Sequence, residues 1–251
     1  VAVKGNFDDC QTAVKKIFSN EEYAKILKEK GYILSSANSI NFGRLAPQIA
    51  YYFSAYLDLV SSDQIAMGDE VNFAVPTGNF GDILAGYYAK KMGLPVGKLI
   101  CASNRNNVLT DFFETGVYDV NREFFKTMSP SMDILVSSNL ERLIYDVENR
   151  DAEKVKAKMQ SLSETGRYEV DKNRVARLRE SFYANFCAEE TCAETIGNFF
   201  EEYEYVLDPH TAVAMSVYDG YACEYPGEAR PAVILSTASP YTVSYTHLSC
   251  R

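Results

Sequence analysis

The stretch Val71-Asn-Phe-Ala-Val-Pro-Thr-Gly-Asn-Phe-Gly-Asp82 reads as a strand that runs into a glycine-rich turn. Its first six residues form a short, mostly apolar run, which is typical of a buried strand. A helix is expected from residue 83 to about residue 92, because Gly93 and Pro95 follow as helix terminators. Residues 98–102 form a second apolar run. This order predicts a βαβ unit with parallel strands and a right-handed crossover.

Helices and strands also alternate on both sides of this unit. We expect Asp8 and Asp9 to cap a helix over residues 11–18, and Asp208-Pro209 to begin another helix, with Asp as N-cap and Pro at the first helical position. Apolar spacing predicts three strands, at residues 1–5, 32–34 and 232–235, and the strand at 32–34 is expected to be buried. It also predicts helices at residues 21–30, 45–60, 140–147, 174–186 and 189–205. The predicted fold class is therefore α/β, with a layered, mostly parallel sheet flanked by helices.

Composition limits the function classes. The chain has 251 residues, 47% of them apolar, and a net charge of −9, which argues against a nucleic-acid partner and gives no support for binding to anionic membranes. No apolar run reaches the length of about 20 residues that a membrane helix needs. The six cysteines form no Cys-x-x-Cys pair and there are only two histidines, so we expect reduced thiols, no metal site and a cytoplasmic protein.

The glycine-rich turn is the first candidate site. Glycines at 78 and 81 let the backbone approach a ligand closely, and the first N–H groups of the following helix favour an anion. A phosphate-binding turn at the carboxyl end of a strand is one interpretation. The alternative is a turn that only connects the strand to the helix. The spacing matches neither the dinucleotide fingerprint nor the nucleotide-triphosphate loop.

Two other polar clusters lie directly beside a predicted helix or strand. Ser35-Ser-Ala-Asn-Ser-Ile-Asn-Phe-Gly-Arg44 precedes the long amphipathic helix, and its amide, hydroxyl and guanidinium groups suit a phosphorylated ligand. Ser236-Thr-Ala-Ser-Pro240 follows the last apolar strand, where hydroxyls suit a ring nitrogen. The alternatives are a well-capped helix with a solvated arginine and an ordinary turn.

Taken together and in order, these motifs resemble threonine synthase. The resemblance rests on Ala37-Asn-Ser-Ile-Asn41 with Arg44, on Gly78-Asn-Phe-Gly-Asp82, on Asp208-Pro-His-Thr-Ala212, on Ser236-Thr-Ala-Ser-Pro240 and on Val3-Lys-Gly-Asn-Phe-Asp-Asp-Cys-Gln11. It implies the tryptophan-synthase β-like fold (fold type II) and pyridoxal 5'-phosphate as cofactor. The implied reaction converts O-phospho-L-homoserine and water to L-threonine and phosphate, the last step of threonine biosynthesis.

The resemblance also implies roles for particular residues. The cofactor phosphate would be held by the backbone N–H groups of Gly78, Asn79, Phe80 and Gly81, and the pyridine nitrogen by the hydroxyl of Thr237. The substrate phosphate would be bound by Asn38, Ser39 and Arg44, with the Asn79 side chain nearby. Two alternatives stay open: another lyase of this fold, such as threonine dehydratase, and a non-catalytic module that binds a phosphorylated amino acid.

Two departures from the family pattern lead to further expectations. The Ser-Phe-Lys-Asp-like segment that carries the family's Schiff-base lysine does not occur, and Lys4 lies in a motif that the family places after that lysine. We therefore expect a shortened chain that is essentially inactive alone. Residues 1–34 would end the smaller cofactor-flanking domain, residues 35–241 would form the larger cofactor-binding domain, and residues 242–251 would be foreign sequence.

Overall fold

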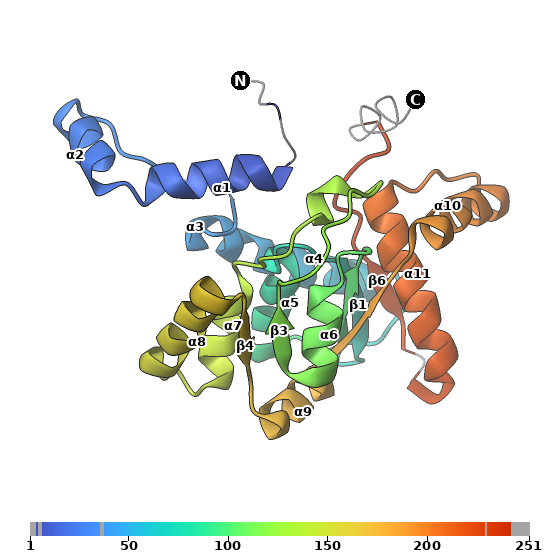
Figure 1. Cartoon of the computed structure of the whole chain (residues 1–251). Helices are drawn as coiled ribbons and strands as arrows, with labels where there is room; N and C mark the ends of the chain where they lie inside the picture. The colour runs from blue at the N-terminus through green and yellow to red at the C-terminus, as the bar shows by residue number, and fades with distance from the viewer. Residues whose placement is uncertain (1–3, 5–6, 36–37, 229, 242–251) are drawn as a thin grey trace.

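A four-stranded parallel sheet lies at the centre of the computed structural model, which describes residues 4, 7–35, 38–228 and 230–241. All three strand pairings in this sheet are parallel. The strand order is β5 (Phe182–Phe186), β2 (Val96–Ser103), β1 (Val71–Pro76) and β6 (Ala232–Ile234). Helix α5 (Gly81–Lys91) connects β1 to β2 (Figure 1), which confirms the predicted βαβ unit and the α/β class.

Helices cover both faces of this sheet because successive side chains of a strand point to opposite faces. Phe73 and Val75 join an apolar core with α4 (Ile49–Ser61), α5 and α6 (Val108–Thr115). Ala74 lies between them in sequence and joins a second core with α10 (Glu189–Tyr203) and α11 (Pro209–Glu224). The β1 strand is buried on both faces, as is typical of a central parallel strand.

A second layer of small elements extends the first core. Strands β3 (Val117–Asp119) and β4 (Arg167–Glu169) pair in antiparallel orientation. Helices α7 (Leu140–Val147), α8 (Ala152–Thr165) and α9 (Lys172–Ser181) surround this ribbon (Figure 1). The periodicity did not predict β3 and β4, because each strand has only three residues.

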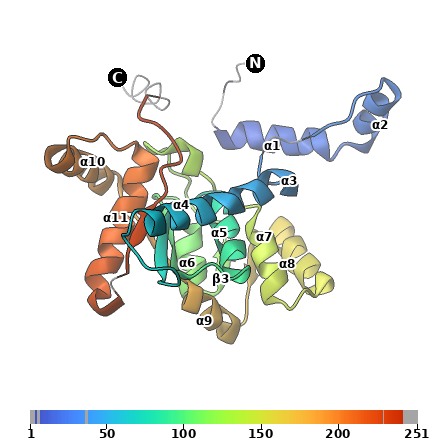
Figure 2. The same ribbon diagram turned by 180° about the vertical axis from the view of Figure 1, so that it is seen from behind.

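The first two helices project from the rest of the molecule. Both views show α1 (Phe7–Phe18) and α2 (Glu21–Glu29) away from the central sheet (Figures 1 and 2). The expected cap at Asp8 and Asp9 is wrong, because the helix already begins at Phe7. The expected buried strand at residues 32–34 is also wrong: Tyr32 and Ile33 are 66% and 87% exposed, and no described strand pairs with them. The strand expected at residues 1–5 and the tail at 242–251 lie outside the described residues, apart from Lys4. The domain boundary at residue 35 stays a prediction.

Two predicted helices are divided in the structure. The helix expected at residues 45–60 consists of α3 (Phe42–Leu45), a 3-10 turn (Ala46–Gln48) and α4, because Pro47 cannot donate a backbone hydrogen bond. The helix expected at residues 174–186 ends at Ser181, and its last five residues form β5 beside β2. Pairing with a neighbouring strand decides that segment. None of the helices in the described part of the chain is long and apolar enough to cross a membrane.

Candidate functional site

The predicted site segments meet at the carboxyl edge of the parallel sheet. Strands β1 and β6 run side by side in the same direction, with Ala74 opposite Ile234. The backbone of Leu235 donates to the carbonyl of Ala74 at 2.9 Å, and that of Thr77 donates to Ala102 at 2.8 Å. The glycine-rich turn and the Ser236–Thr237 segment therefore leave the sheet at one edge, where open α/β sheets bind ligands.

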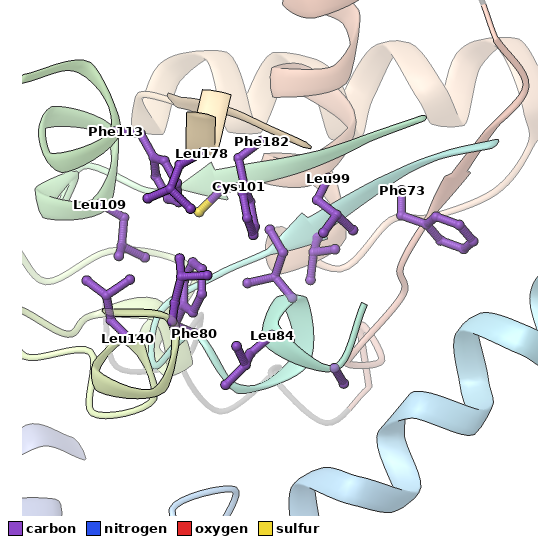
Figure 3. Close-up of a cluster of buried hydrophobic side chains, with 14 of the residues drawn as sticks. Phe73, Phe80, Leu84, Leu99, Cys101, Leu109, Phe113, Leu140, Leu178 and Phe182 are labelled. Carbon is purple, nitrogen blue, oxygen red and sulfur yellow. The ribbon is translucent and has the colours of Figure 1, made fainter. Parts of the chain in front are cut away.

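Phe80 anchors the glycine-rich turn in the core. Its backbone is left-handed, with φ of 62°, and its side chain is 1% exposed. The ring lies 6.1 Å from the ring of Phe113 and 6.0 Å from that of Phe182, measured between centroids (Figure 3). Burial of this ring offsets the cost of a backbone conformation that is uncommon outside glycine. Phe80 is also the N-cap residue of α5, and its side chain makes no capping hydrogen bond.

The turn consequently presents unpaired donors. Among the described residues, no hydrogen bond is donated by the backbone N–H groups of Gly78, Asn79, Phe80 or Gly81. Phe80 and Gly81 are buried, and a buried N–H group without a partner is costly. A bound anion at the start of α5 would satisfy these groups and would interact favourably with the helix dipole.

The two glycines have no space for a side chain. A Cβ built at Gly78 lies 2.9 Å from Cα of Met132, and a Cβ at Gly81 collides with the side chain of Ser39. A methyl group at either position would have to displace the neighbouring chain. Packing against the neighbouring chain therefore requires glycine at both positions, while the close approach of a ligand that the sequence predicts stays a prediction.

Asn79 connects the turn to helix α7. Its Oδ1 accepts hydrogen bonds from the backbone N–H and the hydroxyl of Ser138, both at 2.8 Å. Its carbonyl oxygen accepts from the backbone N–H of Asn139 at 3.3 Å and from the Asn139 side chain at 3.1 Å. Asn139 is the N-cap residue of α7, and its own side chain makes no capping bond. Asn79 thus fixes the two residues that precede helix α7, although it lies far from them in sequence.

The polar segment at Asn38 and Ser39 joins the same cluster. The side-chain nitrogen of Asn79 donates to Oδ1 of Asn38 at 3.4 Å. The side-chain nitrogen of Asn139 donates to the hydroxyl of Ser39 at 3.2 Å. The structure therefore brings together three of the four predicted substrate-binding residues.

Among the described residues, no hydrogen bond joins Arg44, the fourth of these, to that cluster. It lines a cavity of about 490 Å³ together with Asp82 and Thr237. No hydrogen bond or ion pair within the described part of the chain involves the Arg44 guanidinium, so its charge is available to a ligand. Burial raises the pKa of Asp82, although a hydrogen bond from the Tyr52 hydroxyl at 3.0 Å acts in the opposite direction. Arg44 and the predicted ring-nitrogen ligand Thr237 therefore face one cavity.

Sequence reasoning missed the contribution of the α7 segment. Arg142 donates to the carbonyl of Ser39 at 2.8 Å and to that of Ile40 at 2.5 Å. Ser137 donates from its hydroxyl to the carbonyl of Gly78 at 2.5 Å. The available signal was Ser137-Ser-Asn139 before a helix, which resembles the polar run at residue 35 but was interpreted only as a helix cap.

The fold points to a class of protein. A parallel sheet flanked by helices is the arrangement of the fold type II enzymes that use pyridoxal phosphate, and solved structures of that class superimpose on the chain. One is threonine synthase from Brucella melitensis with pyridoxal phosphate bound, at a TM-score of 0.81 and 40% identity. Another is threonine synthase from yeast, at a TM-score of 0.84 and 36% identity.

The particular relationship follows from these identities. Among curated proteins, threonine synthase-like 1 of Homo sapiens is 47% identical over 240 residues, which is 95% of this chain and 32% of that protein. The alignments with the two solved structures cover 96% and 98% of this chain and 49% of each solved chain. No protein-family model matches. The chain is homologous to the threonine synthases along nearly its whole length, as its motifs predict, and it spans between a third and a half of these relatives.

Proposed function

We propose that this chain is the cofactor-phosphate and substrate-phosphate half of a threonine synthase. The complete enzyme would convert O-phospho-L-homoserine and water to L-threonine and phosphate. The homology supports this proposal, and so does the pair of anion-binding regions at one edge of the sheet. A substrate with a leaving phosphate needs a second anion site besides that of the cofactor.

The cofactor phosphate would be held by the N–H groups of Gly78, Asn79, Phe80 and Gly81. The unpaired state of these four donors is the observation that carries the proposal. The hydroxyl of Thr237 would face the pyridine nitrogen. A hydroxyl there leaves that nitrogen largely unprotonated, unlike a carboxylate. When bound, pyridoxal phosphate supplies an electron sink for the proton removals that the reaction requires.

The substrate phosphate would be bound by Asn38, Ser39 and Asn79, with Arg44 closing the site from the neighbouring cavity. The amide and hydroxyl groups supply neutral donors, and the guanidinium supplies charge and a bidentate geometry. This phosphate requirement distinguishes the proposal from a dehydratase that acts on serine or threonine.

The isolated chain would bind ligands without turnover. The residues that line the cavity of Arg44 and Thr237 include no lysine. A lysine is the group that attaches to pyridoxal phosphate covalently and takes part in proton transfer. We also propose a cytoplasmic location, which the free state of the five described cysteines supports.

Binding calorimetry tests the proposal. We expect the chain to bind pyridoxal phosphate more tightly than pyridoxal, since only the former carries the phosphate. Gly81→Ala should weaken pyridoxal phosphate binding roughly tenfold or more, because the new methyl group displaces Ser39 and leaves buried donors unpaired. Gly220→Ala is the matched control, because nothing lies within 4 Å of a Cβ at Gly220.

Two results would contradict the proposal. Equal affinity for pyridoxal and pyridoxal phosphate would remove the phosphate site. Formation of threonine from O-phospho-L-homoserine by the isolated chain would show that its own residues suffice for the chemistry. Far-ultraviolet circular dichroism of each variant checks that the helices are retained.

A further inference from the structure

Asp208 is a buried carboxylate with four hydrogen-bond partners. It is 2% exposed and is the N-cap residue of α11. Its Oδ1 accepts from the backbone N–H groups of His210 at 2.9 Å and Thr211 at 3.3 Å, and lies 3.0 Å from Nδ1 of His210. Its Oδ2 accepts from the hydroxyl of Thr211. Burial acts to raise the pKa of Asp208, but these hydrogen bonds outweigh it and hold the pKa below the ordinary value. The carboxylate is therefore an ionised acceptor.

One connection leads from Asp208 to the wall behind Gly78. Because Nδ1 of His210 donates to the carboxylate, Nε2 is an acceptor, and the backbone N–H of Ser131 donates to it at 3.3 Å. The carbonyl oxygen of Ser131 lies 3.1 Å from a Cβ built at Gly78, so this segment is the surface against which the turn packs. His210 therefore holds the segment that limits where the phosphate-binding turn can lie.

A second connection leads from Asp208 to Thr237. The Thr211 hydroxyl donates to the carboxylate, and its oxygen lies 3.3 Å from the hydroxyl oxygen of Ser236, the residue before Thr237. The hydroxyl oxygen of Ser236 also lies 3.4 Å from the carbonyl oxygen of Ala238. Because each hydroxyl has a single proton, the Asp208 carboxylate competes with Ser236 for the proton of Thr211.

We propose that Asp208 is a positioning residue that sets the two ends of the cofactor site relative to each other, through His210 toward Gly78 and through Thr211 toward Thr237. The inference rests on the proposed function. Its three central residues, Asp208, His210 and Thr211, are each at most 4% exposed. Neither His210 nor Thr211 is proposed to touch the cofactor, so each connection can be cut without removing a ligand.

Two variants cut the connections one at a time. Thr211→Val has nearly the same shape and removes only the bond toward Ser236 and the bond to Asp208. We expect a loss of about threefold to tenfold in affinity for pyridoxal phosphate, a shifted absorption band of the bound cofactor, and unchanged affinity for inorganic phosphate. Thr211→Ser should restore the affinity for pyridoxal phosphate and the absorption band.

His210→Leu cuts the other connection. We expect it to weaken binding of inorganic phosphate and of pyridoxal phosphate by similar factors, because the wall behind Gly78 is released. Hydrogen exchange at the Ser131 amide should accelerate in His210→Leu and stay unchanged in Thr211→Val. Thr195→Val is the control, since the hydroxyl of Thr195 bonds only within α10, at 2.8 Å from the Thr191 carbonyl.

The outcomes separate the two proposals. If the unaltered chain binds neither pyridoxal phosphate nor inorganic phosphate, the proposed function fails, and this inference fails with it. If the two variants bind both probes with the same affinities as the unaltered chain, only this inference is wrong and the proposed function stands. The inference is also wrong if both variants weaken both probes equally, because that pattern reports general loss of structure. The inference is supported if Thr211→Val weakens binding of pyridoxal phosphate alone, His210→Leu weakens binding of both probes, and Thr211→Ser restores the affinity for pyridoxal phosphate.

Discussion

The side-chain oxygen of Asn79 lies 2.8 Å from the backbone nitrogen of Ser138 and 2.8 Å from its hydroxyl oxygen. One side chain therefore holds the segment that leads into helix α7 and, through its nitrogen, contacts Asn38 at 3.4 Å. The stability of the helix and the geometry of the proposed phosphate site depend on the same amide. This double role leads to a prediction in which the two functions of Asn79 separate.

Replacing Asn79 by Asp or Ala should have different effects. Asn79→Asp keeps the acceptor for Ser138 but loses the donor and adds a negative charge, so we expect near-normal stability and strongly reduced affinity for O-phospho-L-homoserine. Asn79→Ala loses both roles and should also lower the free energy of unfolding by about 1 kcal/mol, because the hydrogen bonds to Ser138 are lost. Urea unfolding and binding titration of the two variants check this. Equal stability of Asn79→Ala and the unaltered chain would contradict the role of Asn79 in holding the segment before α7.

Removal of the Phe80 ring should destabilise the whole core. Phe80→Ala leaves a cavity between Phe113 and Phe182 (Figure 3), and we expect a loss of about 3–5 kcal/mol in the free energy of unfolding. Phe186→Ala is the control: because Phe186 is 45% exposed, its replacement should lower the free energy of unfolding far less. Denaturant unfolding measures both. A loss below that of the control would mean that the ring does not anchor the turn.

Arg142 should affect ligand binding more than stability. Arg142→Met keeps the aliphatic stem and removes the bonds to the carbonyls of Ser39 and Ile40 and to Oδ1 of Asn139, so the segment that carries Ser39 is released. We expect weaker binding of O-phospho-L-homoserine by about tenfold, in line with the loss of three charge-assisted hydrogen bonds. Arg177→Met, on the exposed face of α9, should leave binding unchanged. Identical affinities of the two variants would contradict this role.

The acid stability of the chain should depend on Asp146. Burial would raise the pKa of this carboxyl, but hydrogen bonds from Lys91 and Tyr87, at 2.6 Å each, hold it below its ordinary value of 3.8. A carboxyl with a lowered pKa in the folded state contributes stability above the unfolded value, and this contribution is lost as the pH falls through the folded value.

Asp146→Asn should therefore reduce the free energy of unfolding near pH 6 and reduce its slope below about pH 4. Urea unfolding at several pH values measures this slope. Asp58→Asn, on the exposed face of α4, is the control. A slope that is unchanged by Asp146→Asn would show that other carboxyls carry the acid transition.

Local sequence alone determined the centre of the fold. The apolar run before Gly78 predicts β1 with its observed bounds, and Asp208-Pro209 predicts the start of α11 with its observed cap. The glycines at 78 and 81, and the polar residues at 38, 39 and 237, were recognisable from their position beside strands and helices. These signals are local, because periodicity, capping and turn formation involve residues within a few positions of one another.

Only the tertiary structure decided which of these groups meet. Residues 182–186 could have continued a helix, but they form a strand because β2 offers hydrogen bonds along its edge. Asn79 bonds the backbone of a residue 59 positions further along the chain, and Arg142 reaches a carbonyl 103 residues away. Arg44 and Thr237 share a cavity, although the sequence grouped Arg44 with Asn38 and Ser39. Such contacts have no local periodicity. They arise when separate elements pack against one sheet, and each buried donor must then find an acceptor wherever packing places one.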